Sequence, residues 1–295
     1  MAAPPDSHCL LGAIEAGGTK FVMATGTADG TIHARHSIPT SSPEATLGQA
    51  RDWFKTQPAI AALGIASFGP VELDRSSPKW GYITETPKPG WSNCDLAGYF
   101  VRALSLPIGF DTDVNGAALG EFRFGAGRGA SGMAYITVGT GIGGGLIIGG
   151  KLAHGAGHPE MGHFYPRRPA HDRDFEGNCP FHGDCLEGLA SGPAILARWG
   201  KTLSELPQDH EAHECVAGYL AQTCHTLFAC CAIERVVMGG GVMKTPGLAE
   251  RIQKATEKAG GNYLPGRNRQ SVVLPQLGDN SGIIGALLLA EAARS

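Results

Sequence analysis

The chain has 295 residues, of which 42% are hydrophobic and 17% are charged, so it has the composition of a globular protein rather than of a disordered chain. Its net charge of −3, with no basic run, argues against a nucleic-acid partner and against binding to an anionic membrane surface. The N-terminus lacks the basic start and apolar run of a secretory signal, and no apolar stretch is long enough to span a bilayer. We therefore expect a cytoplasmic protein whose length suits two domains.

The first part of the chain predicts a meander of strands. An apolar run at residues 9–14 stops at Glu15-Ala-Gly-Gly-Thr-Lys20 and resumes at residues 21–25, and a further strand is expected at residues 31–35. The spacing is not that of a Walker A loop. The turn Gly17-Gly18-Thr19-Lys20 either offers backbone amides to a phosphate or is an ordinary tight turn.

A carboxylate follows another buried strand in the next segment. We expect helices at residues 46–54 and 92–104, strands at residues 60–67 and 106–110, and a proline-rich loop at residues 84–91. The strand at 106–110 runs into Asp111-Thr112-Asp113, ahead of a helix built on residues 117–122. Asp113 therefore lies where open α/β sheets place their ligands, although Asp111 or Asp113 could equally serve as the helix N-cap.

A second strand–turn–strand unit begins at residue 133. A strand at residues 133–137 leads into Val138-Gly-Thr-Gly-Ile-Gly-Gly-Gly145 and then into a strand at residues 146–148. The repeat of this plan suggests a duplicated domain. A Rossmann fingerprint is disfavoured, because its glycines should open a helix rather than a strand.

The next motifs have the residue types and spacing of a metal site. Cys179, His182 and Cys185 stand three residues apart, which suits a loop around Zn²⁺, and His163 is the nearest fourth ligand, with His158 and His171 as competitors. The alternative is two free cysteines among surface histidines. Glu160 and Glu187 bracket the cluster, so a metal here would also fix two acids in space, as a substrate site requires.

Helices and one strand complete the chain. Residues 191–198 begin a helix with Pro193 near its first turn, residues 211–231 form a long helix, and a strand at residues 235–238 ends at Gly239-Gly240-Gly241. Three glycines let a ring or a phosphate approach the backbone closely. A final helix from residue 279 should pack back on one of the domains. Six cysteines outside the metal loop are expected to be buried free thiols: Cys9, Cys94, Cys215, Cys224, Cys230 and Cys231.

These motifs resemble the ROK sugar kinases, and the bacterial fructokinases are the branch that they resemble most. The resemblance covers about residues 14–286 and rests on Glu15-Ala-Gly-Gly-Thr-Lys20, Asp111-Thr-Asp-Val-Asn115, Thr137-Val-Gly-Thr-Gly-Ile-Gly143, His158-Pro-Glu-Met-Gly-His163 and the Cys179–Glu187 loop. It implies an α/β, two-domain actin/hexokinase-like (ribonuclease H-like) fold with a central cleft. Residues 1–114 with the C-terminal helix at 281–295 would form the small N-terminal domain, and residues 115–280 the larger domain with the zinc loop.

The resemblance also implies roles for individual residues. Asp113 would be the catalytic base, and Thr112, Glu160, His163 and Glu187 would contact the sugar. The ATP site would comprise Gly17, Gly18, Thr19, Lys20, Gly139, Thr140, Gly141, Pro193, Gly239, Gly240 and Gly241. Structural Zn²⁺ would be held by His163, Cys179, His182 and Cys185, and Mg²⁺ would accompany ATP. The family also implies a homodimer.

Three positions depart from the usual family pattern. Glu15 stands where many members have Asp, which changes how Mg²⁺ or its waters are held. Thr112 replaces an Asn whose amide contacts the sugar, and His182 belongs to a zinc loop that is often richer in cysteine.

The resemblance therefore implies an ATP-dependent hexose kinase that converts fructose to fructose 6-phosphate. Mannose, glucose or N-acetylmannosamine could replace fructose without a change in any motif. A sugar-responsive repressor would need a helix-turn-helix segment, and about thirteen residues precede Ile14, too few for that module. A zinc-stapled sugar-binding protein without catalysis is a further alternative, which Asp113 and the two phosphate turns disfavour.

Overall fold

The computed structural model describes residues 9–294, and within this range no helix has both the length and the hydropathy of a membrane span. The described chain forms two compact units. The first contains residues 9–124, 154–158 and 279–294, and the second contains residues 125–153 and 159–278. Compactness thus groups residues 115–124 with the first unit, beyond the boundary expected after residue 114, because helix α3 (Asp113–Phe124) packs along the C-terminal helix α8 (Ser281–Arg294).

The first unit is built on a five-stranded sheet with the order β3-β2-β1-β4-β7. Its strands are β1 (Leu11–Ala16), β2 (Lys20–Gly26), β3 (Ile32–Pro39), β4 (Leu63–Ser67) and β7 (Ile108–Thr112). The first three form the expected antiparallel meander, whereas β1, β4 and β7 are parallel. The carboxyl ends of these three strands therefore lie at one edge of the sheet.

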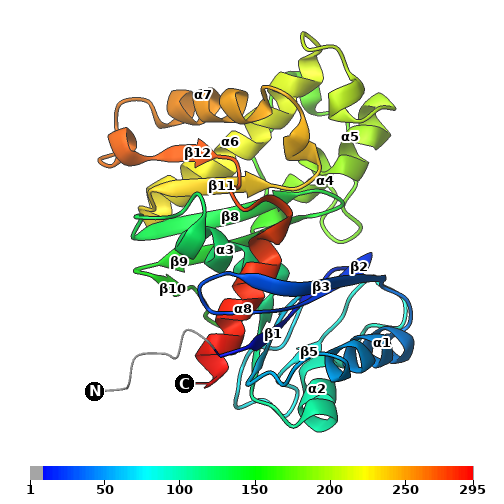
Figure 1. The fold of residues 1–295 in the computed structure, drawn as a ribbon. Coiled ribbons are helices and arrows are strands. Elements are labelled where there is room, and N and C mark those ends of the chain that lie inside the picture. The colour runs from blue at the N-terminus through cyan, green and yellow to red at the C-terminus, as the bar shows by residue number, and fades with distance from the viewer. Residues whose placement is uncertain (1–8, 295) are drawn as a thin grey trace. The chain divides into compact units, whose positions relative to one another are not determined.

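Helices cover both faces of this sheet, and the register shows which residues lie under each. Ile14, Ile65 and Phe110 are neighbours in register and belong to the apolar core shared with α1 (Pro43–Lys55) and α2 (Leu96–Leu104). Their sequence neighbours Gly64 and Gly109 point to the opposite face. That face carries α8, drawn red beside β1 in Figure 1.

Glycine allows α8 to lie directly on the sheet and on α3. A Cβ atom at Gly64 would lie 1.8 Å from the carbonyl oxygen of Ala286, and one at Gly285 would lie 1.7 Å from that of Gly116. Any larger residue would push the helix away. The final helix therefore packs on the first unit as a consequence of backbone-to-backbone contact.

Capping residues set the starts of the two helices on the other face. Ser42 accepts a hydrogen bond from the amide of Ala45 (3.4 Å) and begins α1, and Asp95 accepts one from Gly98 (2.9 Å) and begins α2. The helix expected at 92–104 is shorter for this reason. A small hairpin of β5 (Tyr82–Ile83) and β6 (Cys94–Asp95) precedes α2.

The second unit repeats the sheet plan of the first, with the order β10-β9-β8-β11-β12. Its strands are β8 (Gly132–Val138), β9 (Ile142–Ile148), β10 (Lys151–Leu152), β11 (Arg235–Gly239) and β12 (Ser271–Val273). The first three are antiparallel, β11 pairs parallel with β8, and β12 pairs parallel with β11. The glycine run after β8 leads into a strand, so the rejection of a Rossmann turn is confirmed.

Helices pack on this second sheet around a single apolar core. They are α4 (Leu186–Ala190), α5 (Gly192–Trp199), α6 (Glu211–Cys231) and α7 (Leu248–Gly260), and α6 has the bounds that its sequence predicts. In Figure 1, α6 and α7 lie side by side near β11 and β12. Short 3-10 turns complete the chain: η1 (Met161–His163), η2 (Ala170–Asp172), η3 (Leu203–Glu205), η4 (Val242–Lys244), η5 (Arg267–Arg269) and η6 (Gly278–Asn280).

The prediction that six cysteines are buried free thiols is wrong in its burial. All are free, but only Cys224 is buried, and Cys230 is exposed on the last turn of α6. The other four, Cys9, Cys94, Cys215 and Cys231, are half-buried. An apolar run in a helix buries one face only, so the run alone did not place each thiol.

Candidate active site

The first unit brings the turn at residues 17–20, which is predicted to bind phosphate, and Asp113 to the same sheet edge. The turn at residues 17–20 follows β1, and Asp113 follows β7, which is parallel to β1 with β4 between them. The amide of Gly17 donates to the carbonyl of Lys20 (2.9 Å), and a Cβ at Gly18 would meet no atom within 4 Å. The turn is therefore closed at its base and open at its tip, as an anion-binding turn must be.

Asp113 is the first residue of α3, which begins four residues before the helix that the sequence predicts. The hydroxyl of Thr112 accepts a hydrogen bond from the amide of Asn115 (3.1 Å), so Thr112 fills the N-cap role that was weighed for Asp111 or Asp113. Asp113 is half-buried, and its Oδ1 accepts from the amide of Val114 (2.9 Å). Thr112 is 3% exposed, so its assignment as a sugar contact stays a prediction.

The structure adds three polar residues at this corner that the sequence did not single out as a group. The buried carboxylate of Asp111 lies 2.9 Å from Nε2 of His154 and 2.6 Å from Nδ2 of Asn115. The hydrogen bond to Asp111 raises the pKa of His154, against the opposing effect of burial. Asp111 and Asn115 belong to a quoted motif, but nothing local in the sequence pairs them with a histidine 43 residues away.

Glu15 lies in the same register row and on the same sheet face as Asp111, with Ala66 between them. Burial raises the pKa of Glu15, while the charges of Lys20 and Arg35 oppose that rise. The first turn of α8 packs against it, since a Cβ at Gly282 would lie 2.6 Å from its carboxyl carbon. The part that Glu15 plays toward Mg²⁺ stays a prediction.

The second unit assembles the other residues expected to bind ATP. The amide of Gly139 donates to the carbonyl of Gly141 (2.9 Å), and the amide of Gly192 donates to the carbonyl of Gly139 (2.8 Å). The turn at residues 139–141 is thereby joined to the first residue of α5, beside Pro193. Gly240, with φ +95°, packs on Val138 so closely that a Cβ would lie 2.4 Å from its carbonyl oxygen. The three expected nucleotide-binding segments of this unit are therefore contiguous.

His163, Cys179, His182 and Cys185 form one cluster whose ligand atoms all lie within 4.8 Å of one another. The Nδ1 atoms of His163 and His182 are 3.3 Å apart, and Nδ1 of His163 is 3.8 Å from Sγ of Cys179 and 3.6 Å from Sγ of Cys185. Tetrahedral Zn²⁺ with ordinary bond lengths requires about 3.3 Å between two nitrogens and about 3.6 Å between nitrogen and sulfur. The donor set and its spacing therefore fit zinc.

The structure decides between the three histidines proposed as the fourth member of this cluster. His163 is in it, whereas Nε2 of His158 accepts a hydrogen bond from the amide of Val71 (3.2 Å) in the first unit, and His171 lies on η2 outside the group. The other ring nitrogen of His163, Nε2, lies 3.9 Å from Oε2 of Glu160. The imidazole of His163 can thus offer Nδ1 to a metal while Nε2 faces Glu160, a predicted sugar contact.

Glu187 connects the cluster of His163, Cys179, His182 and Cys185 to the turn at residues 139–141 within the second unit. It lies in the first turn of α4, two residues after Cys185, and its Oε2 accepts a hydrogen bond from the amide of Ile142 (2.9 Å). A Cβ at Gly141 would lie 2.7 Å from the same oxygen. Its carboxylate is therefore packed directly on the turn at residues 139–141.

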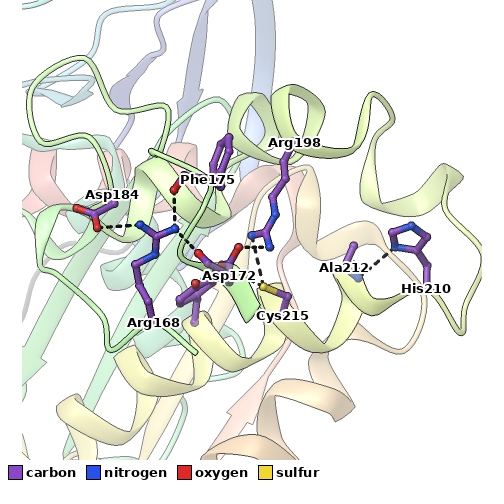
Figure 2. A network of polar contacts seen from close by, with 9 residues as sticks. Arg168, Asp172, Phe175, Asp184, Arg198, His210, Ala212 and Cys215 are labelled. Carbon is purple, nitrogen blue, oxygen red and sulfur yellow. Dashed lines mark hydrogen bonds and ion pairs between the residues drawn. The ribbon is translucent and has the colours of Figure 1, made fainter. Parts of the chain in front are cut away.

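A buried ionic network anchors the loop that leads from His163 to Cys179, as Figure 2 shows. The carboxylate of Asp172 contacts the guanidinium of Arg198 on α5 and the hydroxyl of Tyr219 on α6, and Arg168 pairs with Asp184 (3.1 Å) beside Cys185. A groove of about 840 Å³ between this loop and α6 is lined by His171 but by none of the residues that the family resemblance predicts to bind ATP, sugar or zinc. The network thus ties the metal loop to α5 and α6.

Comparisons with known proteins agree with this architecture. The sequence profile described as the ROK family matches residues 11–293, and the chain belongs to that family. It is 49% identical to a fructokinase of Zymomonas mobilis subsp. mobilis, over 97% of this chain and 98% of that protein, and 45% identical to a putative fructokinase of Bacillus subtilis, over 96% of each.

Among solved structures, the chain resembles the ROK hexokinase from Thermus thermophilus with a TM-score of 0.79 and 24% identity, over 95% of this chain and 97% of that one. The actin/hexokinase-like α/β fold class expected from the sequence is therefore confirmed.

Proposed function

We propose that this chain is an ATP-dependent hexose kinase that phosphorylates fructose at its 6-hydroxyl. The observation that carries the proposal is the 49% identity, over nearly the whole of both chains, to a protein named fructokinase. The motif geometry supports it, because each unit presents a glycine turn of the kind that binds phosphate and the first unit adds Asp113 at the same sheet edge.

Phosphoryl transfer requires positioning and charge neutralisation more than covalent chemistry. Asp113 would accept the proton of the attacking sugar hydroxyl, since a half-buried carboxylate at the strand end can reach a ligand there. The backbone amides of the turns at residues 17–20 and 139–141 would donate hydrogen bonds to the phosphates of Mg·ATP. Pro193 and residues 239–241 would lie beside the adenine base of the nucleotide. Glu15 would act on Mg²⁺ or on its waters. Since this reaction consumes ATP, the proposal places the protein in the cytoplasm.

Thr112, Glu160, His163 and Glu187 would hold the hexose hydroxyls. The placement of Nε2 of His163 toward Glu160 supports this role, because both side chains can then hydrogen-bond neighbouring hydroxyls of one sugar ring. The carboxylate of Glu187 can accept from a hydroxyl while it keeps its bond to the amide of Ile142, since each carboxylate oxygen has more than one acceptor site.

We also propose that the cluster of His163, Cys179, His182 and Cys185 holds one Zn²⁺, which when bound would cross-link the loop without taking part in the chemistry. Burial raises the pKa of the Cys185 thiol to about 11, so a thiolate at this position needs a compensating cation. The family resemblance adds the expectation of a homodimer, which sedimentation of the purified protein tests.

The experiment is an ADP-release assay with Mg·ATP against fructose, mannose, glucose and N-acetylmannosamine, run in parallel on Asp113→Asn. A preference of the wild-type protein for fructose that is lost in Asp113→Asn supports both the proposed reaction and the role of Asp113 as its base. Preference for another of the four sugars would keep the kinase and replace the substrate. No turnover on any sugar by folded, zinc-loaded protein would favour a sugar-binding protein instead.

A further inference from the structure

A hydrogen-bond network centred on the buried carboxylate of Asp111 encloses the corner between β7 and α3, and the mechanism proposed above does not use it. Oδ1 of Asp111 accepts from the amide of Thr112 (2.8 Å) and from Nδ2 of Asn115 (2.6 Å), and Oδ2 lies 2.9 Å from Nε2 of His154. Both oxygens of this carboxylate are therefore occupied. Asp111 is 4% exposed and Asn115 is fully buried, whereas the side chain of His154 is 39% exposed, so the network is closed to solvent at Asp111 and Asn115 and open to it at His154.

Asp113 lies inside the loop of chain that this network closes. Asp111 holds the backbone of Thr112 and the side chain of Asn115, and the hydroxyl of Thr112 in turn holds the amide of Asn115. Thr112, directly before Asp113, and Asn115, two residues after it, are thus both hydrogen-bonded to the carboxylate of Asp111.

His154 reaches this network from a distant part of the sequence. It opens the short segment at residues 154–158, which packs with the first unit although the residues before and after it belong to the second. The charged group that faces His154 is Asp111 of β7, while α3 contributes the neutral amide of Asn115 at 3.4 Å. His158, on the same segment, bonds the amide of Val71.

We propose that His154 is a positioning residue that acts through Asp111 to fix the orientation of Asp113. This inference rests on the proposed role of Asp113 as the base. When Nε2 of His154 donates to Oδ2, the carboxylate of Asp111 keeps the orientation in which Oδ1 holds Thr112 and Asn115. Loss of that donor leaves Oδ2 to solvent on the exposed side of the network. A mobile water does not hold the carboxylate in one orientation, so rotation of the carboxylate and loss of its bonds to Thr112 and Asn115 are favoured.

The charge of His154 strengthens this arrangement. The bond to Asp111 raises the pKa of His154, so the imidazolium form persists to a higher pH than in a free histidine. Below that pKa the contact is an ion pair, and as the pH rises through it a weaker neutral hydrogen bond remains. The hold on Asp111 should therefore weaken on the alkaline side.

The test compares His154→Gln, which keeps an N–H donor near the position of Nε2 but does not titrate, with His154→Leu, which has no donor. His33→Leu, at an exposed position of β3, is the control. Steady-state kinetics with fructose and Mg·ATP are measured between pH 6 and 9. We expect His154→Leu to lower kcat roughly 10- to 100-fold with a KM for fructose within about threefold of wild type, and His154→Gln to restore most of the turnover.

The ratio of wild-type kcat to that of His154→Gln should fall as the pH rises through the pKa of His154, since only the wild-type contact loses its charge. A wild-type kcat in His154→Leu, a Gln variant as impaired as the Leu variant, or an effect confined to KM would each overturn the inference.

A measurement without turnover separates this inference from the proposed function. The carboxyl carbon of Asp113 is followed by ¹³C NMR in the free protein, and its signal should shift in His154→Leu and return toward the wild-type position in His154→Gln. An unchanged signal in both variants would overturn the positioning role. Wild-type protein that phosphorylates no hexose would instead refute the proposed function, while the NMR comparison would still decide the role of His154.

Discussion

Glu187 accepts a hydrogen bond of 2.9 Å from the amide of Ile142, and this contact joins the start of α4 to the turn at residues 139–141. Cys185, two residues earlier, belongs to the metal cluster. A single side chain therefore lies between the residues proposed to hold zinc, hexose and phosphate in the second unit. Substitutions at Glu187 can separate these functions, because the bond from the amide of Ile142 needs only an oxygen acceptor, whereas the proposed contact to the hexose uses the charge of the carboxylate.

Glu187→Gln keeps an oxygen that can accept from Ile142 but removes the charged acceptor offered to the hexose. We expect the KM for fructose to rise about 10- to 100-fold, which corresponds to a hydrogen bond to a charged group of about 1.5–3 kcal/mol, with little change in the KM for ATP. Glu187→Leu removes both contacts and should raise both KM values. Glu176→Gln, at an exposed position of the metal loop, is the matched control. If Glu187→Gln and Glu187→Leu changed the KM for ATP equally, the proposed link between Glu187 and the turn at residues 139–141 would be contradicted.

Asp113→Asn should leave folding and fructose binding largely intact while kcat falls by about 10²- to 10⁴-fold, because the amide cannot accept the proton of the attacking hydroxyl. The measurements are kcat and, by calorimetry, the Kd for fructose. Asp74→Asn, at an exposed turn position, should leave both unchanged. Near-normal turnover of Asp113→Asn would remove Asp113 from the base role.

Cys179→Ser should lower zinc content, melting temperature and activity together, because the cluster fixes the loop that precedes Glu187. Elemental analysis of the wild-type protein should give about one zinc per chain. Cys230→Ser, at an exposed thiol outside the cluster, should behave like wild type in all three measurements. Freshly purified, active protein without zinc would contradict the metal assignment.

Asp172→Ala should lower the free energy of unfolding by about 3–5 kcal/mol, since it leaves the guanidinium of Arg198 and the hydroxyl of Tyr219 without their buried partner. The check is urea unfolding followed by tryptophan fluorescence. Asp184→Ala removes a carboxylate that is 40% exposed and should cost no more than about 1 kcal/mol. Similar losses in the two variants would show that burial of the Asp172 pair does not govern the stability of the loop.

Local patterns in the sequence predicted many of the elements and the grouping of the metal cluster, but they did not predict helix α7 or strand β12. The long stretch rich in Ala and Leu predicted α6 with its observed bounds. The apolar residues after the glycine run predicted a strand at residues 146–148, and the observed strand β9 begins earlier, at Ile142. Cys179, His182 and Cys185 are close in sequence, so their spacing alone predicts that their donor atoms meet.

Contacts between residues far apart in the sequence could not be predicted from local patterns. The pairing of His154 with Asp111 and the bond from Ile142 to Glu187 depend on register and packing that no local pattern encodes. The start of α3 was misplaced for a related reason. Thr112 caps the helix with its side chain, and two acidic neighbours offered more usual candidates for that role.

The central claim is that the chain transfers the γ-phosphoryl group of ATP to O6 of fructose, and the most direct test identifies the product. Uniformly ¹³C-labelled fructose is incubated with Mg·ATP and the zinc-loaded protein, and the sugar is examined by ¹³C and ³¹P NMR. We predict one new phosphomonoester whose phosphorus couples to C6, formed in proportion to ADP. ADP release without a phosphorylated sugar, or no reaction while ¹³C-fructose still binds, would contradict the account.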